Sequence, residues 1–232
     1  MKEHGLVIAV DGPSGAGKST LARLLAKRLQ YIYIDTGAMY RAIGWKALRE
    51  GIDPADEAGL AGLCARTEVM IENNNNDPRF YVDGIDVSGE IRTPEMGMMA
   101  SAVSKSPAVR SRLLTIQREM GKKGGVVMDG RDIGTVVFPD ADLKFFLEAN
   151  AEERGKRRYL ELKARGMDVD LEQITREIRE RDQQDSGRVI APLKKADDAL
   201  LIDTSTLSII EVLNRMLAAI TGVNEKHGST IS

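Results

Sequence analysis

The chain has 232 residues, 42% of them hydrophobic, which is enough apolar material for one or two folded domains and excludes a mainly disordered chain. Its 33 Lys and Arg residues nearly balance its 35 Asp and Glu residues, so a net charge of −2 disfavours nucleic acid as a partner. The apolar runs are far shorter than the ~20 residues of a membrane span, and the single cysteine, Cys64, excludes an internal disulfide.

The N-terminal segment predicts the start of a parallel sheet. Its first residues carry mixed charge and lead directly into a strand pattern, so we expect no signal peptide and a cytoplasmic, monomeric protein. Residues 6–10 form a continuous apolar run, which is typical of a strand buried on both faces. Glycines follow, and apolar residues at helical spacing predict a helix over 18–29. A second strand over 31–34 and a helix ending near Gly51 continue the alternation.

The character of the sequence changes between residues 53 and 106, where we expect an inserted α+β subdomain. Residues 79–87 predict a hairpin with an Asp83-Gly84 turn. The asparagine run 73–76 matches no motif and is interpreted as a loop. Ser106 and Pro107 then provide a helix cap and a first helical residue, so a helix is expected through about residue 122.

The remaining segments complete an α/β pattern. Strands are predicted over 126–129, 143–147 and 200–202, and helices over 151–165, 171–182 and 207–220. We expect residues 221–232 to be a loose tail.

A glycine-rich stretch between the first strand and the first helix matches the pattern G-x-x-x-x-G-K-[ST]. In such a loop, backbone N–H groups surround a phosphate and the helix N-terminus adds its positive dipole end. The alternative is a turn that only joins strand to helix, but the strand and helix on either side favour the phosphate loop. The motif runs from Gly12 to Ser19 and includes Gly15, Gly17 and Lys18. Lys18 would bridge the β- and γ-phosphates of ATP, and Ser19 would bind Mg²⁺.

Asp129 ends an apolar strand and is predicted to hold the metal together with Ser19. The alternative is an ordinary turn aspartate before Gly130. The phosphate loop alone is compatible with a kinase, a GTPase, an ATPase or a regulatory module. The guanine-reading motif Asn-Lys-x-Asp is not found in the sequence, which argues against a GTPase.

Three further strings follow in order: Asp35-Thr-Gly-Ala-Met-Tyr-Arg41, Asp129-Gly-Arg-Asp-Ile-Gly-Thr-Val-Val-Phe-Pro139 and Arg181-Asp-x-x-Asp185-Ser-x-Arg188-x-x-Ala-Pro-Leu193. Together with the phosphate loop, they closely resemble the bacterial cytidylate (CMP) kinase family over residues 6–220. The resemblance implies an α/β fold of the P-loop NTPase type: a five-stranded parallel sheet flanked by helices, an inserted α+β acceptor-binding subdomain and a short helical LID. The implied divisions are a core over 1–52, 107–150 and 187–220, the insert over 53–106, a LID region over 151–186 and a tail over 221–232.

The resemblance also implies roles for individual residues. Arg41, Arg131 and Arg188 would clamp the acceptor phosphate. Thr36, Tyr40, Arg181 and Asp185 would surround the sugar, and Ser101, Arg110 and Asp132 the cytosine. Arg154 and Arg158 match LID arginines that bind ATP. The residues that would hold the ATP phosphates, in addition to Gly12, are Ser14, Gly15, Ala16, Gly17, Lys18, Ser19 and Thr20. The implied catalytic set is Lys18, Arg131, Asp132, Arg158 and Arg188.

The expected reaction is phosphoryl transfer from ATP, with Mg²⁺, to CMP or dCMP, giving CDP or dCDP and ADP. Alternatives are another small-molecule kinase acting on UMP or shikimate, and a nucleotide-binding switch without catalysis. For single residues, Arg154 and Arg158 could belong to a solvated helix face. Arg181 could pair with Glu177, four residues earlier, although sharing a helical face with Asp185 favours a ligand role.

Overall fold

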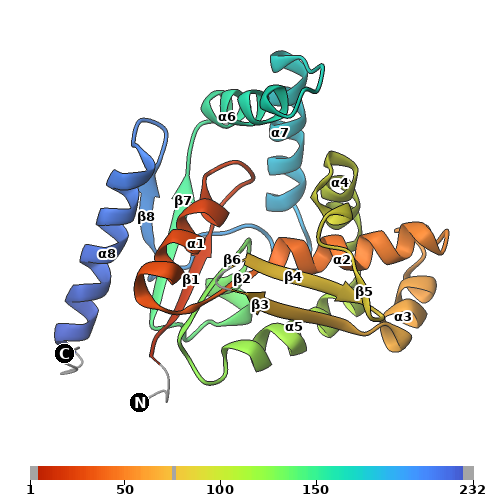
Figure 1. Ribbon diagram of the computed structural model, residues 1–232, viewed down its shortest axis with the longest axis horizontal. Coiled ribbons are helices and arrows are strands. Elements are labelled where there is room, and N and C mark those ends of the chain that lie inside the picture. Colours follow the sequence, from red (N-terminus) through yellow and green to blue (C-terminus); the bar gives the residue numbers. More distant parts are fainter. Residues whose placement is uncertain (1–4, 75–76, 227–232) are drawn as a thin grey trace.

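The computed structural model describes residues 5–74 and 77–226 (Figure 1). Its centre is a parallel sheet with the strand order β2-β6-β1-β7-β8. The five strands are β1 (Val7–Asp11), β2 (Ile32–Asp35), β6 (Val126–Gly130), β7 (Leu143–Glu148) and β8 (Leu200–Asp203). This architecture confirms the predicted five-stranded parallel sheet.

Helices cover both faces of this sheet, and the alternation along β1 shows why. Ile8 and Val10 face the core cluster formed with α1 (Lys18–Leu29) and α8 (Ile209–Lys226). Val7 and Ala9 face the opposite cluster, whose helical side chains come mainly from α2 (Thr36–Arg49) and α5 (Pro107–Gly121). Because both faces are buried, the strand is apolar at every position before Asp11.

The inserted segment contains a small antiparallel sheet with the order β3-β4-β5. Its elements are α3 (Glu57–Arg66), β3 (Val69–Asn74), β4 (Asp77–Val82), β5 (Ile85–Asp86), the 3-10 turn η1 (Glu90–Arg92) and α4 (Pro94–Val103). Val82 pairs with Ile85, and the two turn residues Asp83 and Gly84 have φ values of 50° and 79°. These positive values are those of a type I′ turn, so the predicted Asp-Gly hairpin is confirmed.

The prediction that residues 73–76 form a loop is wrong for its first half. Asn73 and Asn74 belong to β3, where they pair with Pro78 and Asp77. Antiparallel pairing with β4 outweighs the turn preference of asparagine here. The other two asparagines, 75 and 76, lie outside the described residues.

Two helices, α6 (Ala151–Ala164) and α7 (Leu171–Ser186), pack on each other above the C-terminal edge of the central sheet (Figure 1). They share a small apolar cluster of Leu162, Ile174 and Ile178. The helix predicted over 171–182 extends to Ser186, because the carbonyl of Gln183 still accepts an N–H, that of Gly187. Asp185 is therefore helical.

The predicted loose tail is also partly wrong. α8 continues to Lys226, because its backbone hydrogen bonds propagate past Ile220 and a single glycine, Gly222, is tolerated at a modest cost. Residues 227–232 lie outside the described part of the chain. Within that part, no helix combines the length and apolar character that a bilayer crossing requires.

Candidate active site

The loop between β1 and α1 adopts a conformation that its glycines make possible. Gly12, Gly15 and Gly17 have φ values of 145°, 79° and 87°, a region that other residues rarely occupy. A Cβ atom on Gly12 would lie 1.9 Å from the carbonyl oxygen of Leu147, so β7 also requires a glycine there. The loop joins a parallel strand to a helix N-terminus, which is the context predicted for a phosphate site.

Lys18, the first residue of α1, is buried beside this loop, and its Nζ donates to the carbonyl of Pro13 at 2.6 Å. Burial, followed by the nearby guanidinium of Arg131, lowers the pKa of Lys18 well below its ordinary value. Arg181 acts in the same direction, and Asp129 opposes it. The phosphate-loop lysine therefore lies close to arginines that the sequence assigns to the acceptor.

The two predicted metal-binding side chains touch each other. The hydroxyl of Ser19 donates to Asp129 Oδ2 at 2.8 Å, and that of Tyr33 donates to Asp129 Oδ1 at 3.0 Å. Burial and the neighbouring carboxylate of Asp35 raise the pKa of Asp129 to about 6. Asp35 is opposite Asp129 in the pairing of β2 with β6.

The hydroxyl oxygen of Ser19 and the carboxylate of Asp129 fit Mg²⁺, which prefers oxygen ligands. Mg²⁺ is commonly held by one or two protein groups plus water and substrate phosphates. A cluster of three or more potential ligands from His, Cys, Asp and Glu is not found among the described residues. Such a cluster is not needed when the phosphates supply ligands.

Asp185 of α7 binds two arginines that the sequence placed on the acceptor. Arg131 Nε donates to Asp185 Oδ2 at 2.8 Å, and Arg188 donates to Asp185 Oδ1. Burial opposes ionisation of Asp185, but Arg131 and Arg188 outweigh it, and the net effect lowers its pKa. One carboxylate thus holds guanidinium groups from two separate segments.

Further positive charge surrounds this pair. Burial and Arg131 lower the pKa of Arg181 to about 10, with Arg41 and Arg188 contributing. The buried Nε atoms of Arg41, Arg181 and Arg188 lack a hydrogen-bond partner within the part of the chain that the structure describes. Arg41 also donates to Asp35 at 2.9 Å. Buried donors that are left over in a cluster of arginines are suited to a multiply charged anion.

Arg110 and Asp132, predicted to read the base, form a buried ion pair. Arg110 also donates to the carbonyl of Ser104 at 3.3 Å, and its guanidinium lies 5.8 Å from the centroid of the Tyr40 ring. Burial raises the pKa of Tyr40 to about 12 and that of Asp132 above its ordinary value. The hydroxyl of Ser101 is buried without a partner among the described residues. Thr36, assigned to the sugar, donates to the carbonyl of Asp129 at 2.7 Å.

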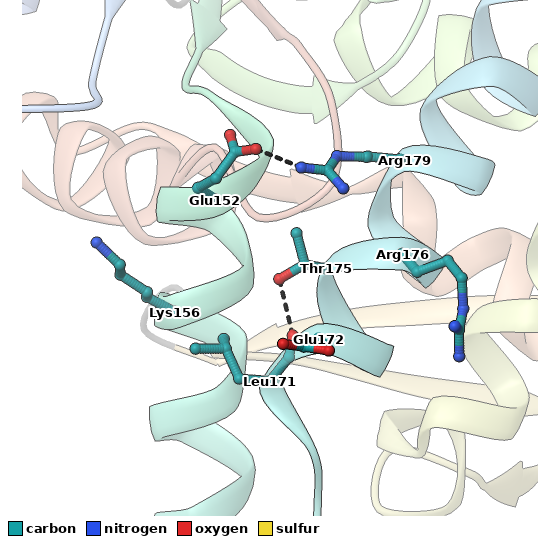
Figure 2. Close-up of a pocket in the computed structure, with 7 residues that line it drawn as sticks. All are labelled: Glu152, Lys156, Leu171, Glu172, Thr175, Arg176 and Arg179. Atoms are coloured by element: carbon teal, nitrogen blue, oxygen red, sulfur yellow. Dashed lines mark hydrogen bonds and ion pairs between the residues drawn. The ribbon is translucent and has the colours of Figure 1, made fainter.

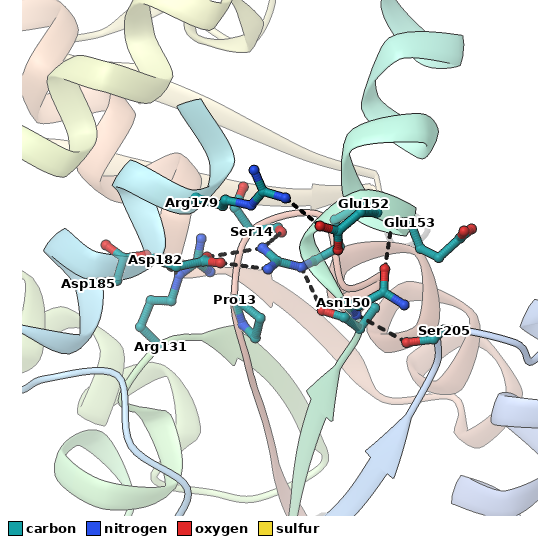
Figure 3. Close-up of polar contacts among 12 residues, drawn as sticks. Pro13, Ser14, Arg131, Asn150, Glu152, Glu153, Arg179, Asp182, Asp185 and Ser205 are labelled. Atoms are coloured by element: carbon teal, nitrogen blue, oxygen red, sulfur yellow. Dashed lines mark hydrogen bonds and ion pairs between the residues drawn. The ribbon is translucent and has the colours of Figure 1, made fainter. Parts of the chain in front are cut away.

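Arg154 connects the helix pair to the phosphate loop. Its partners Ser14 and Asp182 are labelled in Figure 3. Its Nη1 donates to the carbonyl of Ser14 at 3.0 Å, and its guanidinium binds both carboxylate oxygens of Asp182, at 3.0 and 2.5 Å. Its Nε donates to the carbonyl of Ala149 at 2.8 Å. Arg154 is buried and engages the loop backbone, so the solvated-face alternative does not describe it.

Arg158 has a different environment, since its side chain is about one-third exposed and pairs with Glu161 at 2.8 Å on the same helix. The structure does not bring it together with the other predicted site residues. Glu177, the alternative partner of Arg181, instead accepts a hydrogen bond from Gln173 at 2.9 Å.

Sequence reasoning missed two carboxylates. Asp11 is the last residue of β1 and accepts the backbone N–H groups of Ile133 and Gly134 at 2.8 and 2.7 Å. Burial raises its pKa to about 7 despite these hydrogen bonds. The sequence feature that could have identified Asp11 is a charged residue at the end of an apolar strand. Asp182, the partner of Arg154, follows Arg181 in the third of the strings described above, but the sequence assigned it no role.

A separate surface pocket of about 480 Å³ lies between α6 and α7 (Figure 2). Its lining residues are Glu152, Lys156, Leu171, Glu172, Thr175, Arg176 and Arg179. They include no predicted site residue, so we place the candidate site at the edge of the sheet instead.

Comparisons with known proteins were made for sequence and for structure. A family model described as cytidylate kinase matches residues 8–222. The cytidylate kinase of Geobacter sulfurreducens is 57% identical over 213 residues, which cover 92% of this chain and 91% of that protein. That of Bacillus subtilis (strain 168) is 50% identical over 218 residues, covering 94% and 97%.

Solved structures share the fold at low identity. An uncharacterized protein from Eubacterium ventriosum has a TM-score of 0.51 at 13% identity and covers 93% of this chain and 98% of its own. A gluconokinase from Sinorhizobium meliloti has a TM-score of 0.50 at 14% identity and covers 97% of both chains.

Proposed function

The chain belongs to the cytidylate kinase family, and from this premise we propose that its residues transfer the γ-phosphoryl group of ATP to CMP or dCMP, giving CDP or dCDP and ADP. A phosphate oxygen of the acceptor attacks the γ-phosphorus, and the bond to the bridging oxygen of ADP breaks. The loose transition state of such a transfer needs in-line placement and positive charge more than a strong base.

The observation that carries this proposal is the position of Lys18 beside the arginine cluster of Arg131, Arg181, Arg188 and Arg41. Arg131 and Arg181 both lower the pKa of Lys18, and Arg131, Arg41 and Arg188 lower that of Arg181, which supports a shared field of positive charge. Two anions that repel each other, the γ-phosphate and the acceptor phosphate, need such a field to approach. Asp185 prevents the arginines from separating by binding two of them.

On the donor side, the N–H groups of the phosphate loop would bind the ATP phosphates, and Lys18 would neutralise charge between the β- and γ-phosphates. Mg²⁺ would be held by Ser19 directly and by Asp129 through water, and it would neutralise phosphate charge. Arg154 supports this loop through the Ser14 carbonyl. A direct contact of Arg154 or Arg158 with ATP remains a prediction.

On the acceptor side, Arg110 suits the O2 and N3 acceptors of cytosine, and the Asp132 carboxylate and Ser101 hydroxyl suit its N4 amino group. Uracil has an acceptor at position 4 and a donor at N3, so both contacts would be mismatched. The unpartnered, buried Ser101 hydroxyl supports a polar ligand here. We place the sugar between Thr36, Tyr40, Arg181 and Asp185.

A coupled assay of ADP release with CMP, dCMP, UMP and shikimate as separate acceptors tests the proposal. We expect rapid release with CMP and dCMP, much slower release with UMP and only background with shikimate. A preference for UMP or shikimate would contradict the acceptor assignment. Nucleotide binding without release above background would support a non-catalytic switch instead.

A further inference from the structure

Asp11 links the end of β1 to the segment that follows β6. Its two carboxylate oxygens each accept one backbone N–H, from Ile133 at 2.8 Å and from Gly134 at 2.7 Å. These residues begin the π-helical turn η2 (Ile133–Val137), which starts immediately after Asp132. A side chain 122 residues away in the sequence therefore satisfies the first donors of this turn.

A cap from a distant residue has a consequence for Asp132. An aspartate at this position ordinarily accepts the first free N–H groups of its own helix. Here the side chain of Asp132 makes no capping hydrogen bond, and its carboxylate pairs with Arg110 instead. The Asp132 carbonyl accepts the N–H groups of Val136 and Val137, which fixes the residue's backbone within the turn.

The surroundings of Gly134 show how closely this arrangement is packed. A Cβ atom there would lie 3.3 Å from Asp11 Oδ2 and 3.0 Å from Lys144 Cδ. Lys144 is itself buried, and its amine donates to Asp198 at 2.9 Å. The side chains of Asp11 and Lys144 thus both lie close to Gly134, and little space is left at this position.

We propose that Asp11 is a positioning residue for base selection: by capping the turn after β6, it leaves the Asp132 carboxylate for Arg110 and for the amino group of a cytosine. This inference rests on the proposed function and adds a residue to it. Asp11 does not itself touch the acceptor in this account. Asp11 also raises the pKa of Lys18 on the donor side, so the acceptor-side effect is identified by the CMP-over-UMP ratio of kcat/KM, which a change confined to Lys18 would leave unchanged.

The test is Asp11→Asn, which keeps the size of the side chain but replaces one acceptor oxygen by the amide NH₂ group. This group is a hydrogen-bond donor and would face a backbone N–H, which is also a donor. We expect kcat/KM for CMP to fall by about tenfold or more, with a smaller loss for UMP, so that the CMP-over-UMP ratio narrows. KM for ATP should change by less than about threefold. A purely structural role would lower the active fraction equally for both acceptors and leave the ratio unchanged.

A matched control is Asp142→Asn, because Asp142 also accepts a backbone N–H of β1, that of Val7 at 2.7 Å. Val7 is at the opposite end of the strand, and Asp142 is more exposed than Asp11. We expect this variant to keep the wild-type ratio.

A second variant, Gly134→Ala, perturbs the same contact from the other side and retains every charge. Gly134→Ala should also narrow the CMP-over-UMP ratio of kcat/KM, by a smaller factor. If Asp11→Asn does not fold, this variant tests whether the contact between Asp11 and the turn supports base selection. The proposal is overturned if the folded variants keep the wild-type CMP-over-UMP ratio, or if Asp142→Asn narrows it equally. Wild-type protein without CMP kinase activity would instead refute the proposed function.

Discussion

Asp182→Asn removes the negative charge that binds the buried guanidinium of Arg154. The exposure of the two side chains sets limits on the resulting loss in the free energy of unfolding. Removing one partner of a fully buried ion pair costs about 3–5 kcal/mol, whereas an exposed pair contributes about 0–1 kcal/mol. The side chains of Arg154 and Asp182 are 5% and 25% exposed, so this pair lies between those limits. Asparagine still offers one acceptor, and Arg154 keeps its bonds to the Ser14 and Ala149 carbonyls. We therefore expect a loss of about 2 kcal/mol in the free energy of unfolding.

Thermal unfolding followed by circular dichroism measures this loss as a decrease in Tm of about 4–8 °C for a chain of this length. The control is Glu152→Gln, because Glu152 and Arg179 also join α6 to α7. Their side chains are 57% and 56% exposed, so we expect no resolvable change in Tm. Asp182→Asn should also raise KM for ATP several-fold, because the guanidinium of Arg154 that contacts the Ser14 carbonyl is held less firmly without the Asp182 carboxylate. Equal losses in the two variants, or a larger loss in Glu152→Gln, would refute the argument from burial.

Four further predictions concern single residues. Lys18→Ala should remain folded but lose nearly all turnover; near-normal kcat in a folded variant would exclude the donor site. Arg188→Lys keeps the charge but loses the planar fork, so kcat should fall even at saturating CMP, and a change confined to KM for ATP would move Arg188 to the donor side. Asp132→Asn should narrow the CMP-over-UMP ratio of kcat/KM by about 1–3 kcal/mol, whereas equal loss with both acceptors would show that Asp132 acts only by orienting an arginine. The raised pKa of Asp129, about 6, means that the folded state binds the extra proton, so wild-type stability relative to Asp129→Asn should fall as pH rises from about 4 to 6 in urea titrations; a constant difference would contradict the raised pKa.

The features that sequence predicted correctly depend on local physical chemistry. The glycines of the phosphate loop, the Asp83-Gly84 turn and the Ser106 cap each fix the backbone within a few residues, and Ser106 accepts the N–H of Val109 as expected. The continuous apolar run of β1 reflects burial on both faces, which predicts a parallel sheet without further information. The extents of helices were less predictable: α7 and α8 continue beyond their predicted ends because intact backbone hydrogen bonds outweigh weak stop signals.

The sequence by itself determined the phosphate loop, the sheet and, through its resemblance, the set of candidate acceptor arginines. Only the tertiary structure decided which partner each charged side chain takes. Asp11 binds a turn 122 residues away, Arg154 binds Asp182 and the phosphate loop, and Arg158 remains in a pair on its own helix. The pattern in the sequence is similar for Arg154 and Arg158, but burial separates them. Local conformation follows from a residue and its neighbours, whereas the choice of an ionic partner depends on which segments packing brings together and on how far water is excluded between them.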